Sequence, residues 1–144
     1  MILPDVNVLV YGFHADEPRH PTTRAWLGDV LSAPGQRLGL TESTVTGFVR
    51  IVTNPRIYDD PAPTRSANAY VRSLVDTGAT SWLQPNRATW EAFQRLCHGD
   101  RLLRADLIPD AWLAALALAH GARIASADRG FGRFPGIEHF DPTG

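Results

Sequence analysis

Acidic residues occur at positions in this sequence where a carboxylate could take part in chemistry. Asp5 interrupts an apolar, β-branched stretch, and Asp128 directly follows a second stretch of the same kind. Glu42 and Asp110 each lie just inside the start of an expected helix. A carboxylate inside a hydrophobic strand costs free energy unless something pairs with it, so Asp5 is the hardest of these acids to explain structurally.

Carboxylates that lie close together repel one another and raise each other's pKa unless a cation is present. Mg²⁺ and Mn²⁺ prefer oxygen ligands, and Mg²⁺ keeps several of its waters, which suits an open cluster of carboxylates. A metal held in this way lowers the pKa of a bound water and stabilises charge on a phosphate under attack. The chemistry indicated is metal-assisted phosphodiester hydrolysis without a covalent nucleophile.

Each acid also has a purely structural interpretation. Asp and Glu are favoured in the first turn of a helix by the helix dipole, which would account for Glu42 and Asp110. Asp128, in the sequence SADRG, is equally typical of a turn. The histidines show neither an HxH nor an HExxH spacing, so a histidine metal site is not expected.

The elements that position these acids alternate between strand and helix. We expect strands over the first half of 2–13, over 80–83 and over 123–126, with 137–140 as a further candidate. Helices are expected over 21–33, from Thr41 as N-cap to about 54, over 64–78, around 90–97, and over 109–120 with Gly121 as C-cap. This alternation predicts an α/β fold, with a mostly parallel central sheet flanked by helices.

Ligands of α/β sheets collect outside the carboxyl ends of the strands, where the following helices begin. Asp5 is expected near the end of the first strand, and Glu42, Asp110 and Asp128 at strand ends or helix starts. All of these acids are therefore expected to converge at one edge of the sheet.

Composition limits the class of protein. The 144 residues predict a single domain over 1–144, and a formal charge of −1 excludes a basic field over the whole protein. The lone Cys97 excludes an internal disulfide and fits a reducing cytosol. The longest apolar run, Ala111 to Ala119, is much shorter than the roughly 20 residues of a spanning helix, and no basic segment precedes the N-terminal apolar stretch. We expect a cytoplasmic protein with no membrane segment.

Three segments of the sequence resemble the PIN-domain ribonucleases, and in particular the VapC toxins of bacterial toxin–antitoxin pairs. The segments are MILPDVNVLVYG, LTESTVTGFVRIVTNPRI and LIPDAWLAALALAHGARIASADRGFGRFPGI. The last is the most specific, because it combines an acid opening an alanine-rich helix, a glycine stop, a short strand, and a small hydroxyl residue two positions before an Asp.

The resemblance implies a PIN-like α/β/α sandwich and a Mg²⁺-dependent endoribonuclease, with Mn²⁺ as a possible substitute. It places the family's metal-binding acids on Asp5, Glu42, Asp110 and Asp128, with Asn7 and Ser126 in supporting positions. It also implies cleavage of structured or single-stranded RNA, with tRNA or rRNA as targets, and inhibition of translation. The expected partners are a VapB-like antitoxin and a second copy of the chain.

Several assignments stay open. Asp106 lies four residues before Asp110 and could be the metal ligand in its place, although we interpret Asp106 as the N-cap of the last helix. A non-catalytic PIN-like module that binds RNA or a partner is the alternative function. An aspartate-nucleophile phosphatase is disfavoured, because Asn7 stands where a second Asp is normally found. The tryptophans are interpreted as core or interface residues, and the candidates for phosphate contacts are Arg50, Arg56, Arg129 and Arg133.

Overall fold

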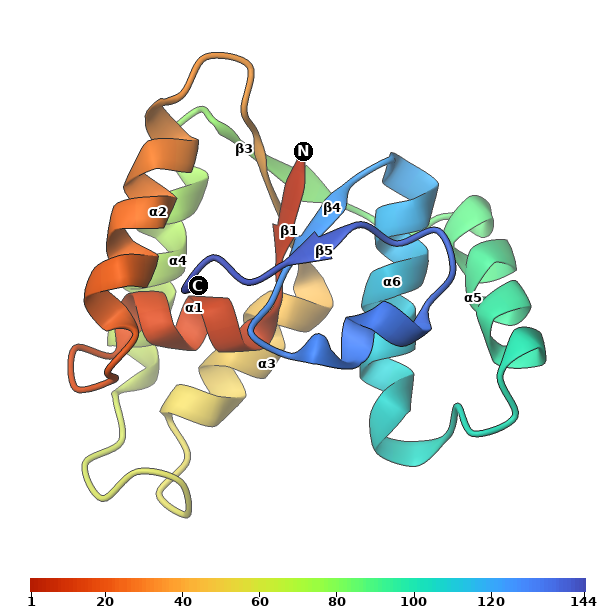
Figure 1. Ribbon diagram of the computed structural model, residues 1–144. Coiled ribbons are helices and arrows are strands. Elements are labelled where there is room, and N and C mark those ends of the chain that lie inside the picture. The colour runs from red at the N-terminus through yellow and green to blue at the C-terminus, as the bar shows by residue number, and fades with distance from the viewer.

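Five parallel strands form one sheet in the order β3-β2-β1-β4-β5 in the computed structural model, which describes residues 1–144. The strands are short, and β1 and β4 lie side by side in the centre of the sheet (Figure 1). Their bounds are β1 (Ile2–Pro4), β2 (Leu38–Thr41), β3 (Thr80–Leu83), β4 (Arg123–Ala125) and β5 (His139–Phe140).

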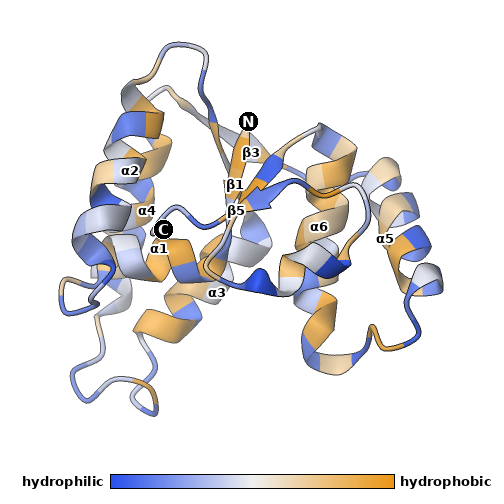
Figure 2. Cartoon of the chain, in the orientation of Figure 1, coloured by the Kyte–Doolittle hydropathy of each residue, from blue (hydrophilic) through white to orange (hydrophobic).

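Helices cover both faces of this sheet (Figure 1). One face packs against α1 (Val6–Phe13), α2 (His20–Ser32), α3 (Glu42–Val52) and α4 (Thr64–Val75). The other packs against α5 (Arg87–Gly99), α6 (Ile108–His120) and the 3₁₀ helix η2 (Arg129–Arg133), and a short 3₁₀ turn, η1 (Ala105–Leu107), precedes α6. Figure 2 shows that α1 and α6 are the most hydrophobic helices. The layers form the α/β/α sandwich that the sequence predicts.

The strand order reverses between β1 and β4. From β1 the chain moves to β2 and β3 through helices on one face, and it returns to β4 through α5 and α6 on the other face. Such a switch point is where ligands bind in open parallel sheets, because the two sets of crossover helices separate there. A ligand site is therefore expected at the carboxyl ends of β1 and β4.

Most of the expected elements are confirmed within a few residues. The strand over 80–83 is found as expected, and the last helix ends at Gly121, whose φ of 62° and ψ of 34° are the left-handed conformation of a helix stop. The expected turn after Asp128 is the 3₁₀ helix η2. Thr41 occupies the N-cap position of α3, but its side chain makes no capping hydrogen bond.

Two elements differ from the sequence-based expectation. The first strand ends at Pro4, and the apolar residues after it form helix α1, so Asp5 lies between a strand and a helix and does not interrupt a strand. Strand β2 (Leu38–Thr41) was not expected. It is fully buried between β1 and β3 and too short to show an alternating pattern.

None of the helices has both the length and the hydropathy needed to cross a membrane.

Candidate active site

Asp5 is held in place as the N-cap of α1. Its backbone is extended (φ −71°, ψ 164°), and its N–H donates to the carbonyl of Ala125 on β4 at 2.9 Å. Its Oδ1 accepts a hydrogen bond from the N–H of Val6 at 2.7 Å. The strand-to-helix turn thus fixes the carboxylate at the carboxyl end of β1.

Asn7 and Ser126 complete the support of Asp5 from two separate segments. Asp5 Oδ2 accepts hydrogen bonds from Ser126 Oγ at 2.8 Å and from Asn7 Nδ2 at 3.0 Å. Asn7 Nδ2 also lies 3.1 Å from Ser126 Oγ, and Asn7 Oδ1 accepts from the N–H of Ala127 at 3.3 Å. The two residues interpreted as supporting from the sequence therefore join the ends of β1 and β4 around Asp5.

The same network positions Asp128. Its N–H donates to Ser126 Oγ at 3.0 Å, and its Oδ1 accepts from the N–H of Gly130 at 2.8 Å, which caps η2. Asp128 is thus both a turn residue, as its local sequence suggests, and a member of the acidic group.

Three carboxylates lie within electrostatic range of one another. Burial is the main reason that the pKa of Asp5 is raised; the hydrogen bonds from Ser126 and Val6 lower it, and the charge of Asp128 raises it. Burial, followed by the charges of Asp5 and Asp128, raises the pKa of Asp110 to about 6. Asp110 is half-buried in the first turn of α6 and makes no hydrogen bond or ion pair through its side chain. No protein cation forms an ion pair with it or lowers its pKa.

Glu42 differs from the other three acids in that its charge contributes to the pKa shift of neither Asp5 nor Asp110. It is the first residue of α3, as predicted; its side chain is exposed, as that of Asp128 is, and it makes no hydrogen bond or ion pair. No group of three or more His, Cys, Asp or Glu side chains is close enough together to form a ligand set for a metal ion. The assignment of all four acids to one metal site thus stays a prediction.

A pocket of about 200 Å³ opens beside Asp5 and Asp110. Arg50 near the end of α3 and Trp112 on α6 contribute to its wall. Trp112 is half-buried, with its ring 5.5 Å from that of Phe93 in an edge-to-face arrangement. The remaining lining residues are Val6, Ser43, Thr44, Gly47, Ile51, Pro109 and Leu113. The apolar stripe on which Trp112 lies in the sequence indicates a core or interface role. That Trp112 also lines this pocket follows only from the fold, which places α3 opposite α6.

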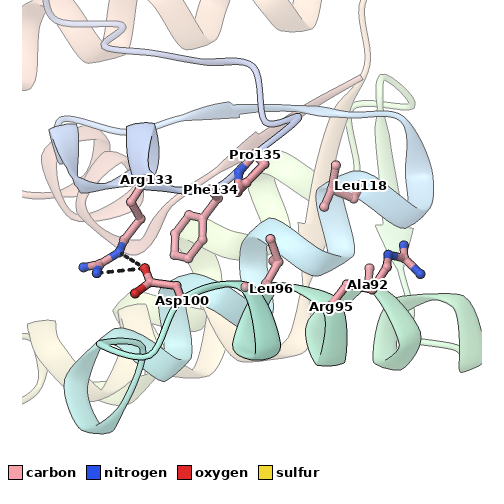
Figure 3. A pocket seen from close by; sticks show the side chains of 9 residues that line it. Ala92, Arg95, Leu96, Asp100, Leu118, Arg133, Phe134 and Pro135 are labelled. Atoms are coloured by element: carbon pink, nitrogen blue, oxygen red, sulfur yellow. Dashed lines mark hydrogen bonds and ion pairs between the residues drawn. The ribbon is translucent and has the colours of Figure 1, made fainter.

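The candidate arginines have different surroundings. Arg133 forms an ion pair with Asp100, with Nη2 and Nε at 3.0 Å and 3.1 Å from Asp100 Oδ2, next to a second pocket of about 370 Å³ (Figure 3). Arg50 and Arg56 are exposed, and neither guanidinium makes a hydrogen bond or an ion pair. Of these arginines, Arg50 is the one that lines the pocket beside the carboxylates.

The interpretation of Asp106 as an N-cap is wrong. Asp106 lies within the 3₁₀ turn η1, and the residue at the N-cap position of α6 is Leu107. The side chain of Asp106 is exposed, and it does not line the pocket beside Asp5. Asp110 is therefore the acid of this segment that reaches the site.

Comparison with known proteins agrees with this fold. The family model described as PIN domain matches residues 2–137. Ribonuclease VapC43 of Mycobacterium tuberculosis is 40% identical over 134 residues, covering 93% of this chain and 90% of that protein. Ribonuclease VapC31 of the same species is 34% identical over 142 residues, covering 99% of each chain.

Solved structures share the fold at low sequence identity. VapBC2 from Rickettsia felis, solved bound to a DNA fragment from its promoter, matches with a TM-score of 0.73 at 12% identity, covering 98% of each chain. VapBC-1 from nontypeable Haemophilus influenzae matches with a TM-score of 0.71 at 17% identity, covering 100% of each chain. With the family model spanning nearly the whole sequence and VapC relatives at up to 40% identity, the chain belongs to the PIN-domain family and, within it, to the VapC proteins.

Proposed function

We propose that this protein is a divalent-metal-dependent endoribonuclease and the toxin of a toxin–antitoxin pair. The observation that carries the proposal is the group of uncompensated carboxylates at the switch point of the sheet, where Asp110 has a pKa raised to about 6. Clustered acids with perturbed pKa values and no protein cation are typical of metal-dependent catalytic sites. The relatives named as VapC ribonucleases support the same activity.

The donor set fits Mg²⁺ or Mn²⁺. Asp5 and Asp110 would be the principal ligands, with Glu42 and Asp128 completing the site directly or through water. Two carboxylates are sufficient, because Mg²⁺ retains several waters and is commonly held by one or two carboxylates together with substrate phosphates. When bound, such an ion supplies activation of water and stabilisation of negative charge at a phosphodiester.

The protein's own residues provide the orientation. Three hydrogen bonds to Asp5 hold its carboxylate in place, and those from Ser126 and Val6 lower its pKa against the larger, opposite effect of burial. They occupy three of about four acceptor positions, which leaves a lone pair free for an ion. Asp110 has no hydrogen bond, so both of its oxygens remain available. Ser126 and Asn7 are thus positioning residues for Asp5.

The substrate is RNA, structured or single-stranded, with tRNA or rRNA as the expected targets and inhibition of translation as the consequence. We further propose a VapB-like antitoxin as partner and a homodimer as the assembled toxin. Two of the structural neighbours are VapBC proteins, which supports the antitoxin proposal.

Purified protein tests the activity directly. Incubation of total bacterial RNA with wild type and Mg²⁺ or Mn²⁺ is expected to give discrete fragments, which EDTA or Asp5→Asn abolishes. In cells, induced wild type should arrest growth and amino-acid incorporation while Asp5→Asn does neither. Fragments produced equally by both proteins would refute the assignment.

One observation favours the alternative of a non-catalytic module that binds RNA or a partner. Glu42 contributes to the pKa shift of neither Asp5 nor Asp110, and no three acids form a compact ligand set. Under this alternative the wild type binds RNA without cutting it, and its binding is insensitive to Mg²⁺.

A further inference from the structure

The pocket beside Asp5 and Asp110 combines groups with different chemical preferences. Asp5 and Asp110 form one part of the wall, Arg50 another, and Trp112 with aliphatic residues a third. A small inorganic ligand would use only the first of these. The pocket therefore fits a ligand with three kinds of group. A flat apolar group would lie against the aromatic residue, an anion would bind the arginine, and a cation carried by the ligand would bind the pair of acids.

Arg50 is available for an anion. Its side chain is exposed, and although it lines the pocket it makes neither a hydrogen bond nor an ion pair with the carboxylates there. The guanidinium of Arg133, by contrast, already forms an ion pair with Asp100. A guanidinium presents several N–H groups in a fork that matches phosphate oxygens, so Arg50 can hold a phosphate beside the acids.

Trp112 is available for a flat ring. It follows Asp110 by two residues on α6, is half-buried and braced by Phe93, and still contributes to the pocket wall. Nucleobases that are unpaired and unstacked are commonly bound against aromatic side chains, whereas bases inside a duplex cannot enter such a pocket.

We propose that this pocket binds one unpaired nucleotide of the substrate RNA, with Arg50 on its phosphate and Trp112 against its base. The inference rests on the proposed ribonuclease function and adds the residues that select an unpaired nucleotide next to the acids. Arg50 contributes an electrostatic contact that is independent of sequence, and Trp112 contributes the requirement for a splayed base.

The test measures binding separately from cleavage. All proteins carry Asp5→Asn, so that the RNA stays intact, and the probe is a fluorescein-labelled, single-stranded RNA decamer of randomised sequence in Mg²⁺ buffer, read by fluorescence anisotropy. Trp112→Leu is expected to weaken binding roughly 5- to 150-fold, the range for loss of one stacked base. Arg50→Gln should weaken binding and reduce the slope of log Kd against log salt concentration by about 0.7, as expected for one lost phosphate contact on a single strand.

Matched controls lie outside the pocket. Arg72→Gln on α4 and Trp90→Leu on α5 remove the same types of side chain from positions that do not line it, and each should change Kd by less than twofold. Trp112→Phe retains an aromatic plane and should lose less affinity than Trp112→Leu. A labelled RNA duplex of the same length should bind more weakly than the decamer and should not respond to Trp112→Leu.

The proposal is overturned if Arg50→Gln or a folded Trp112→Leu binds the decamer within twofold of the parent. Should Trp112→Leu fail to fold, Arg50→Gln alone tests the proposal, because the Arg50 side chain is exposed and makes no hydrogen bond or ion pair in the fold. Failure of the proposed function is read separately, from cleavage of total RNA by protein without these substitutions. If wild type cuts RNA while the pocket variants bind like the controls, the proposed ribonuclease activity stands and the proposed nucleotide-binding pocket is refuted.

Discussion

Replacing Asp110 by Asn should stabilise the metal-free protein while removing its response to metal. Asp110 is a half-buried carboxylate that faces the charges of Asp5 and Asp128 without an ion pair to any cation, and its pKa is about 6 in place of the ordinary 3.8. If the site were fully buried, this difference would correspond to about 3 kcal/mol of destabilisation at neutral pH. Solvent screening of a half-buried group reduces the figure to about 1–2 kcal/mol.

The assay is thermal unfolding at pH 7.5, first in EDTA and then with Mg²⁺ or Mn²⁺. For a chain of this size, the gain of Asp110→Asn in EDTA corresponds to a Tm about 3–8 °C above wild type. Metal at ten times its Kd should stabilise wild type by about 1.4 kcal/mol and leave the variant unchanged. Asp106→Asn is the matched control, since it removes an exposed acid of the neighbouring turn and should change neither Tm.

The pH dependence follows from the direction of the pKa change. Because the folded state raises the pKa of Asp110, the penalty is absent below about pH 4, grows between pH 4 and 6, and is fully present above pH 6. The Tm difference between variant and wild type should therefore shrink as the pH falls from 7 to 5. An Asp110→Asn protein that is less stable than wild type in EDTA, or that gains as much stability from metal, would refute the reasoning.

Other consequences of the geometry can be checked in parallel. Ser126→Ala removes a donor to Asp5 and should weaken Mn²⁺ binding by about 10- to 100-fold in calorimetry, whereas Ser126→Thr retains the hydroxyl and most of the affinity. Wild-type affinity for Mn²⁺ should fall as the pH drops below about 6, because protons compete for Asp110; an affinity that stays constant from pH 7.5 to 5 would place the ion elsewhere. Gly12→Ala would drive a methyl group against the Tyr70 hydroxyl and Leu27 and should cost about 1–3 kcal/mol in urea unfolding, with Gly28→Ala, where the added methyl meets nothing, as control.

Much of the architecture is predictable from local patterns. The strand over 80–83 lies between Gly78 and Pro85, and the last helix is delimited by Pro109 and Gly121, so both are found where the sequence places them. Strand β2 cannot be predicted from local patterns, because it has only four residues and one of them is Gly39. A Cβ at Gly39 would lie 3.0 Å from atoms of Leu3 and of Leu83, so the glycine reflects close packing between neighbouring strands, which no local pattern records.

Helix α1 is the second element that sequence patterns miss. Its residues are apolar on nearly every face, which is equally typical of a buried strand. The helix is favoured over a strand by the N-cap at Asp5 and by packing against the other helices on this face of the sheet. The placement of Asp5 at the end of a strand is nevertheless confirmed, because the strand simply ends one residue before it.

The candidate site could be predicted at the level of the sheet edge and no further. The parallel pairing of β1 with β4 brings Asp5 and Ser126 together independently of loop conformation, and the two side chains form a hydrogen bond. Which helix faces meet across that edge depends on tertiary packing, so the exposure of Glu42 and the place of Trp112 in the pocket required the fold.

The most direct test of the central claim is a calorimetric titration of Mn²⁺ into wild type, Asp5→Asn and Asp106→Asn, paired with cleavage of total RNA by the same preparations. Wild type and Asp106→Asn are expected to bind Mn²⁺ and to produce the same discrete fragments, whereas Asp5→Asn should lose both properties while retaining its fold by circular dichroism. Cleavage and Mn²⁺ affinity at wild-type levels in Asp5→Asn would contradict the assignment of Asp5 to a catalytic metal site.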